Sequence, residues 1–126
     1  AQKEFPMKQA LEQGLMVAIG TDSPVIDIDP KYSLYGAVFR KTLSGKSCGT
    51  QQAISMRQAI WTYTQAGAVM SFEENRKGSI TQGKWADFVV LPLDPTAVCE
   101  SEAEKLLEMQ VIATVLDGTC VHGGIE

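Results

Sequence analysis

Leu15-Met-Val-Ala-Ile-Gly-Thr-Asp-Ser-Pro-Val25 is an apolar run that ends on a polar, turn-forming cluster. Met16–Ile19 has no alternating polar position, which predicts a strand covered on both faces, as parallel strands in α/β proteins are. Ligands and catalytic groups gather just past the carboxyl ends of such strands, and Asp22 occupies that position. The alternative is that Asp22 closes an Asx-type turn or caps a short helix.

Several motifs along the chain carry a resemblance to a known family. They are Gly20–Pro24, Gln51–Ile60 leading to Tyr63-Thr64, Gly78–Leu91 followed by Asp94-Pro95, and Val115–Gly118. In this order and spacing they resemble the carboxyl-terminal part of the amidohydrolase superfamily, in the branch that contains N-substituted formamide deformylase. The block Gly78–Leu91 is the most specific of these motifs.

The resemblance implies a fold and a division of the chain. Family members combine a (β/α)8 barrel with a small β-sandwich, so an α/β fold is expected. Residues 1–74 would form the last βα portion of the TIM-like barrel, and residues 75–126 the closing segment of the β-sandwich. A complete barrel needs about 250 residues. The 126 residues present therefore predict an incomplete barrel and a fragment of a longer enzyme.

The resemblance also implies a catalytic role for Asp22. Family members hydrolyse C–N bonds of the amide type with a bound metal, here expected to be Zn²⁺, which lowers the pKa of a bound water toward about 7. By position Asp22 would ligate that metal, accept the proton of the water and pass it to the departing amine. The family's other ligands are histidines, and this sequence has one histidine, His122, near its opposite end. Catalytic zinc sites generally need three protein ligands, so the chain alone is expected to be inactive and to hold no zinc tightly.

A second hypothesis is a truncated, stand-alone protein without catalytic activity. A single parallel strand and half a sandwich would leave unpaired edges, and such edges pair with other chains. Self-association into a homo-oligomer, or binding of a partner, would then be its function.

Composition limits the kinds of binding partner and cellular compartment that the protein could have. The net charge is −4 and the basic residues are scattered, which argues against nucleic-acid or membrane-surface binding. The resemblance implies a small-molecule substrate for the parent enzyme. No signal peptide or apolar run of about 18 residues is visible, and the three cysteines have no motif spacing. Free thiols in a reducing, cytoplasmic setting are expected.

Two weaker site candidates also have structural explanations. Asp27 and Asp29 form an Asp-x-Asp that could bind Mg²⁺, although loop carboxylates before a proline are usually solvated. Cys120 and His122 would share a face of a strand and could form a thiol–imidazole pair, although packing with a surface imidazole is the commoner explanation.

The remaining elements follow from periodicity and capping signals. Ser55 and Gln58 have capping-box spacing before a helix whose buried face would include Tyr63 rather than present it to a substrate. Asp87 is expected to be a satisfied structural carboxylate, and Asp117-Gly118 predicts a two-residue hairpin turn. In the first half of the chain we expect a helix from Pro6 to a Gly14 C-cap, a helix over 33–43 and a helical face extending to Met70. In the second half we expect a Gln82-Gly83 turn, a strand in 85–91 and a helix over 101–109 beginning at Ser101.

Overall fold

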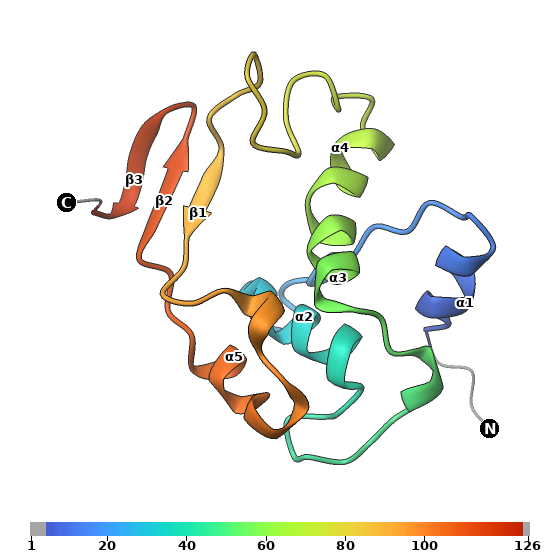
Figure 1. Ribbon diagram of the computed structural model, residues 1–126. Coiled ribbons are helices and arrows are strands. Elements are labelled where there is room, and N and C mark those ends of the chain that lie inside the picture. The colour runs from blue at the N-terminus through green and yellow to red at the C-terminus, as the bar shows by residue number, and fades with distance from the viewer. Residues whose placement is uncertain (1–4, 125–126) are drawn as a thin grey trace.

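The computed structural model describes residues 5–124. Helices gather on one side and a small sheet stands on the other, with an arched connection between them (Figure 1). The helices are α1 (Met7–Glu12), α2 (Pro30–Phe39), α3 (Met56–Tyr63), α4 (Gln65–Met70) and α5 (Glu104–Glu108), with 3-10 turns at Thr50–Gln52, Pro95–Ala97 and Glu100–Glu102. The strands are β1 (Phe88–Val90), β2 (Ala113–Leu116) and β3 (Thr119–Gly123).

The sheet is antiparallel, in the order β1-β2-β3. Leu116 pairs with Thr119 across Asp117-Gly118, whose φ angles of 47° and 75° are those a tight hairpin turn requires, so the predicted hairpin is confirmed. The Asp87 carboxylate accepts the Asp117 N–H at 2.8 Å. Asp87 is therefore the satisfied structural group that the sequence predicts.

The strand predicted at Met16–Ile19 is wrong. Residues 15–22 have no regular secondary structure, and Leu15 and Met16 are 57% and 46% exposed. A strand is stable when its backbone groups pair with a neighbour, and the strands of residues 5–124 pair among themselves in the small sheet. The Ile19 N–H instead donates to the Thr62 carbonyl at 3.1 Å, which fastens this segment to the end of α3.

The capping box before α3 is confirmed. The Ser55 hydroxyl accepts the Gln58 N–H at 3.2 Å, and the Gln58 side-chain oxygen accepts the Ser55 N–H at 2.9 Å. The helical face does not continue unbroken to Met70, because the backbone turns at Thr64 (φ −120°, ψ −81°) and starts again as α4. The Thr64 hydroxyl donates to the Ile60 carbonyl at 2.7 Å, a local bond that competes with regular helical pairing.

The ends of the other helices differ in part from their predicted positions. Gly14, at φ 75°, ends α1 as predicted, and the N–H groups of Gly14 and Leu15 return to the Leu11 and Ala10 carbonyls. The helix predicted over 33–43 begins earlier, at Pro30, because Asp29 caps it, and it ends earlier, at Phe39, because Arg40 adopts a left-handed conformation (φ 50°). The predicted start of a helix at Ser101 is wrong, since Ser101 lies in a 3-10 turn that precedes α5.

The core joins α2, α3 and α5. Leu106 is fully buried, and the rings of Tyr35 and Phe39 lie 5.4 Å apart beside it. A second cluster, around Ala59 and its buried neighbours on α2 and before α3, receives the Ile19 side chain. The irregular segment before Asp22 is therefore held by both packing and a backbone hydrogen bond.

Residues 71–87 form the arch that connects α4 to β1. The Arg76 guanidinium lies 4.2 Å from the centre of the Trp85 ring, and the Trp85 backbone N–H donates to the Arg76 carbonyl at 2.8 Å.

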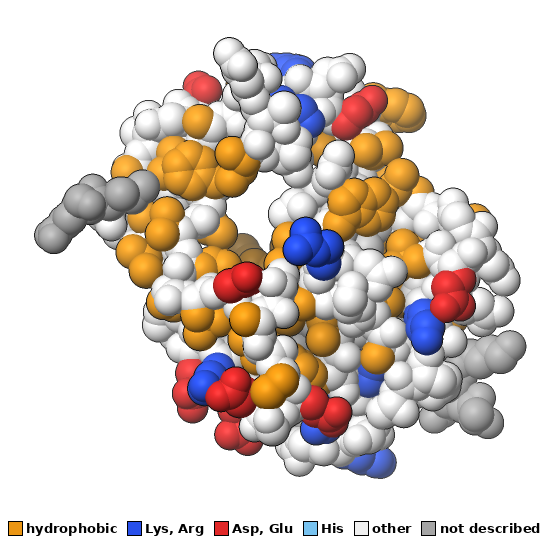
Figure 2. All heavy atoms as spheres, viewed as in Figure 1, with side chains coloured by type: hydrophobic (Ala, Val, Ile, Leu, Met, Phe, Trp, Pro, Cys, Tyr) orange, Lys and Arg blue, Asp and Glu red, His pale blue; other side chains and the backbone are white. Residues whose placement is uncertain are grey.

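Figure 2 shows an opening through the molecule between the sheet and the helices, with apolar side chains around it. Across residues 5–124, none of the helices has the length and apolar character needed to span a membrane.

Candidate functional site

Asp22 lies on an exposed loop with an unusual backbone conformation. Its φ of 57° is in the left-handed region, which Asp tolerates better than most residues. Its carbonyl accepts the Val25 N–H at 2.8 Å, so the residue does close a turn through its backbone. The side chain is exposed, which makes the carboxylate available for chemistry at the surface of this chain.

The end of α3 fixes the residues that lead into Asp22. Tyr63 is the last residue of α3 and follows Thr62, whose carbonyl accepts the Ile19 N–H at 3.1 Å. Burial raises the pKa of the Tyr63 phenol; the polar side chain of Thr21 opposes that rise and the negative charge of Asp29 adds to it. The sequence places Tyr63 in the core, whereas the structure half-buries it.

The residues present do not by themselves fit a metal centre. Within residues 5–124, no three His, Cys, Asp or Glu side chains cluster closely enough to hold a metal ion. A catalytic zinc site generally uses three protein ligands, and Asp22 offers one. Any zinc bound near Asp22 would need donors from outside this part of the chain.

Asp29 caps a helix and Asp27 bonds the backbone just before it, and within residues 5–124 neither belongs to a group of three potential metal ligands. The Asp29 side chain accepts the Lys31 N–H at 3.0 Å and caps α2, with Pro30 at the first helical position. The Lys31 ammonium pairs with the same carboxylate at 3.0 Å, and this hydrogen-bonded pair raises the lysine pKa. Asp27 accepts the Asp29 N–H at 2.9 Å. The pattern Asp29-Pro30 is the sequence signal that could have identified this cap.

Cys120 and His122 do not form a thiol–imidazole pair. The Cys120 sulfur contacts the His122 backbone carbonyl at 3.3 Å, so it approaches the main chain and not the ring. Cys48, Cys99 and Cys120 are exposed, and within residues 5–124 they form no disulfide bond with one another.

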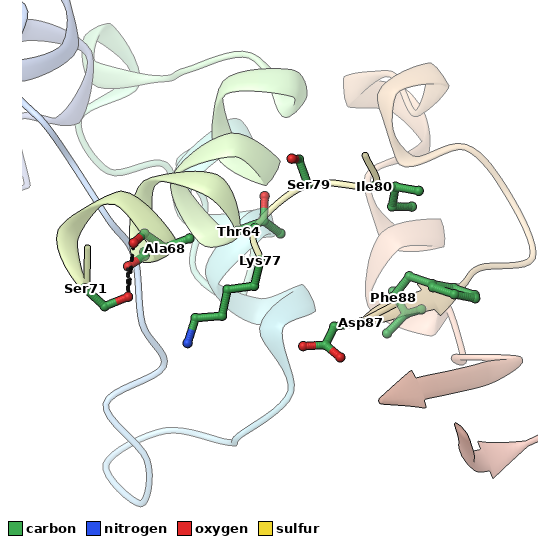
Figure 3. Close-up of a pocket in the computed structure, with 11 residues that line it drawn as sticks. Thr64, Ala68, Ser71, Lys77, Ser79, Ile80, Asp87 and Phe88 are labelled. Atoms are coloured by element: carbon green, nitrogen blue, oxygen red, sulfur yellow. Dashed lines mark hydrogen bonds between the residues drawn. The ribbon is translucent and has the colours of Figure 1, made fainter. Parts of the chain in front are cut away.

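A groove of about 490 Å³ lies between α4 and the start of β1. Figure 3 shows Thr64, Ala68 and Ser71 on its helical side and Ile80, Asp87 and Phe88 on its sheet side. Its charged groups have structural partners: Lys77 pairs with Glu73, and Asp87 accepts the Asp117 N–H. Asp22 does not line this groove. The size of the groove is therefore no reason to regard the groove as the catalytic site.

The fold is that of part of an amidohydrolase. A crystal structure of an amidohydrolase from Thermotoga maritima superposes on 94% of this chain with a TM-score of 0.69 and 22% identity. The matched region makes up 26% of that protein.

Sequence comparison supports the same class. The model described as the amidohydrolase family matches residues 1–122, and the chain therefore belongs to the amidohydrolase family. N-substituted formamide deformylase of Arthrobacter pascens is 33% identical over 116 residues, covering 92% of this chain and 21% of that protein. Amidohydrolase YtcJ of Bacillus subtilis is 31% identical over 121 residues, covering 94% and 22%. The chain thus spans about a fifth of the length of the curated relatives it matches.

Proposed function

We propose that this chain is part of a metal-dependent amidohydrolase that hydrolyses a C–N bond of the amide type in a small molecule. Family membership over residues 1–122 is the observation that carries this proposal. A deformylase that acts on N-substituted formamides, among the relatives, gives the amide class of substrate. The barrel fold of residues 1–74, the sandwich of residues 75–126 and a cytoplasmic location stay predictions.

Asp22 is the residue that we propose this chain contributes to the reaction centre. Its exposed carboxylate, on a loop fastened to α3, suits a group that must meet ligands supplied by another part of the enzyme. Zn²⁺ is the metal proposed for the complete enzyme. Because residues 5–124 do not form a zinc site, we assign no catalytic step to this chain alone.

A chimera tests the proposal. Residues 1–122 of this chain would replace the matching 21% of the Arthrobacter pascens deformylase, and hydrolysis of an N-substituted formamide and bound zinc would be measured together. The chimera should hydrolyse the formamide, and Asp22→Asn should lower kcat by roughly 10²–10⁴-fold, the range for loss of a proton-transfer group.

Asp27→Asn is the matched control, because Asp27 is an exposed carboxylate on the same loop whose contact is local. It should leave activity within about twofold of the parent chimera. Equal activity of the Asp22 and Asp27 variants would contradict the role of Asp22. A folded chimera without zinc or hydrolysis would contradict the proposed function.

Self-association is a second candidate function, favoured by the exposed surface. The chain exposes 8489 Å², whereas a compact monomer of 13.7 kDa exposes about 6600 Å². The surplus includes apolar residues in the sheet, with Leu116 57% and Val121 58% exposed. We propose that, in the absence of the rest of an enzyme, β3 pairs with a second copy of the chain.

A further inference from the structure

A cavity of about 400 Å³ lies just beyond the turn that Asp22 closes. It is lined by the Asp22 loop at Ile26, by helix α2 and by a short hairpin loop, residues 41–47. Because the Asp22 carbonyl accepts the Val25 N–H, these residues form a β-turn, and the Cα atoms of Asp22 and Ile26 lie within about 11 Å. Ligand pockets span roughly 300–1,000 Å³, so this cavity has room for one ring-sized group.

The surfaces that the cavity offers to a ligand are mainly apolar. Tyr32 and Tyr35 lie three residues apart on α2 and both line the cavity. Tyr35 is buried, and its ring packs 5.4 Å from that of Phe39 in the core, which holds this wall in place. Ile26 and Leu43 line the cavity from the two loops and are 47% and 70% exposed. An apolar ligand would cover surface that these two side chains otherwise expose to water.

The charged groups at the cavity already have partners. The Lys41 ammonium pairs with Glu100 at 2.9 Å, and the Asp27 carboxylate accepts the Asp29 N–H at 2.9 Å. A charged ligand would have to compete with these contacts, whereas an uncharged apolar group would leave them intact. The lining therefore favours an apolar ring over an ionic ligand.

The hairpin loop is held in position by its own hydrogen bonds. The Thr42 N–H donates to the Lys46 carbonyl at 2.9 Å, which closes the loop. Arg40, at the end of α2, is buried, and its Nε donates to the Cys48 carbonyl at 3.1 Å. The wall that Thr42 and Leu43 form is thus present before a ligand binds, which reduces the entropic cost of binding.

We propose that this cavity is a specificity pocket that receives an apolar, ring-sized substituent of the amide substrate. The assignment rests on the proposed function of Asp22, since a substituent bound here leaves the amide group on the Asp22 side of the turn. A substrate that carries only a methyl group would leave the cavity unfilled. Each methylene that a larger substituent buries should improve kcat/KM about fourfold.

The first test compares two substrates in the chimera described above. The value of kcat/KM is measured for N-(cyclohexylmethyl)formamide and for N-methylformamide, and their ratio reports the pocket because the same bond is cleaved in both. Ile26→Trp fills the cavity and should lower this ratio about 10-fold or more. Ile26→Ala removes contact surface and should lower it about 3- to 10-fold.

Ile28→Trp and Ile28→Ala are the matched controls. Ile28 has the same side chain on the same loop, is 75% exposed and does not line the cavity. Both variants should keep the ratio within about twofold of the parent chimera. Equal losses for the two substrates in the Ile26 variants, or the same change of ratio in the Ile28 variants, would overturn the pocket in favour of a general disturbance of the loop.

The second test measures binding to this chain on its own, without catalysis. Isoleucine and leucine methyl groups are labelled with ¹³C, and the signals of Ile26 and Leu43, identified by substitution, are followed by NMR during titration with the cyclohexylmethyl formamide. Both signals should shift, and the Ile28 signal should not. Unshifted Ile26 and Leu43 signals at millimolar formamide would overturn the pocket.

The two tests distinguish failure of the pocket from failure of the proposed function. Shifted Ile26 and Leu43 signals together with a folded chimera that hydrolyses neither formamide would keep the pocket and overturn the proposed function. An active chimera that depends on Asp22 but whose substrate ratio is indifferent to both Ile26 variants would keep the proposed function and overturn the pocket.

Discussion

Asp22, Asp27 and Asp29 share one loop and one side-chain chemistry, and their neighbours give them different roles. Asp29 caps α2 and pairs with Lys31, and Asp27 accepts the Asp29 N–H. Asp22 closes its turn through the backbone carbonyl, and its carboxylate is exposed. At the scale of single residues, a capping pattern such as Asp29-Pro30 can be recognised in the sequence, whereas a left-handed φ at Asp22 cannot.

Ser55 provides a test of a cap that the sequence did predict. Ser55→Ala removes the acceptor of the Gln58 N–H, and the free energy of unfolding should fall by about 1 kcal/mol. Urea unfolding monitored by circular dichroism measures this change. Ser44→Ala, in an exposed loop where the hydroxyl contacts Thr42, should change stability by less than about 0.5 kcal/mol. Equal effects of the two substitutions would show that the box does not stabilise α3.

Some secondary-structure elements are specified by local sequence signals such as caps and turns, whereas others form only beside a neighbouring strand or helix. The hairpin at Asp117-Gly118 and the start of α3 depend on local turn and capping chemistry, and both are where the sequence predicts them. Met16–Ile19 has the composition of a buried strand, but a strand also needs neighbours, and residues 5–124 place none beside it. Composition alone therefore predicted a strand that this chain does not form.

The approach of the arch to α4 depends on one glycine. A Cβ on Gly78 would lie 2.6 Å from the Ala68 Cβ, and its φ of 90° disfavours side chains. Gly78→Ala should therefore lower the free energy of unfolding by about 1–3 kcal/mol. This close approach explains physically why the Gly78–Leu91 motif begins with a glycine.

Gly67, within α4, is the matched control because a Cβ there has no atom within 4 Å. Gly67→Ala should raise stability by about 0.5–1 kcal/mol through helix propensity. Thermal unfolding of both variants measures the two opposite shifts. Loss of stability in both would indicate that α4 tolerates no added methyl group, and would remove Gly78 as a special contact.

At the scale of the whole molecule, the family could be predicted from the sequence and the arrangement could not. The motifs between Gly20 and Gly118 lie within the residues 1–122 that match the family, and they combine turns, caps and buried positions in a fixed order. The hydrogen bond from the Ile19 N–H to the Thr62 carbonyl joins residues far apart in the chain, and no spacing pattern within either segment indicates it. Such contacts depend on how the elements pack and not on the pattern within any one of them.

Self-association is the prediction that belongs to this scale. The chain should form a dimer of twice 13.7 kDa in light scattering coupled to gel filtration. Its exposed surface exceeds that of a compact monomer by about 1900 Å², and burial of this area between two copies would be favourable. Val121→Lys, in the exposed outer strand β3, should shift the mass to that of a monomer. Leu43→Lys, at an apolar loop position that is 70% exposed, should not. A monomeric parent chain at all concentrations would contradict this candidate function.

The arch between α4 and β1 also gives the molecule two separate fluorescent reporters. Of its two tryptophans, Trp61 lies in α3, while Trp85 lies at the sheet end of the arch beneath the Arg76 guanidinium. Trp61→Phe leaves emission from the sheet side, and Trp85→Phe leaves emission from the helices. Denaturation curves of these two variants would coincide if helices and sheet unfold as one unit, and would separate if the opening between them divides the chain into two cooperative units.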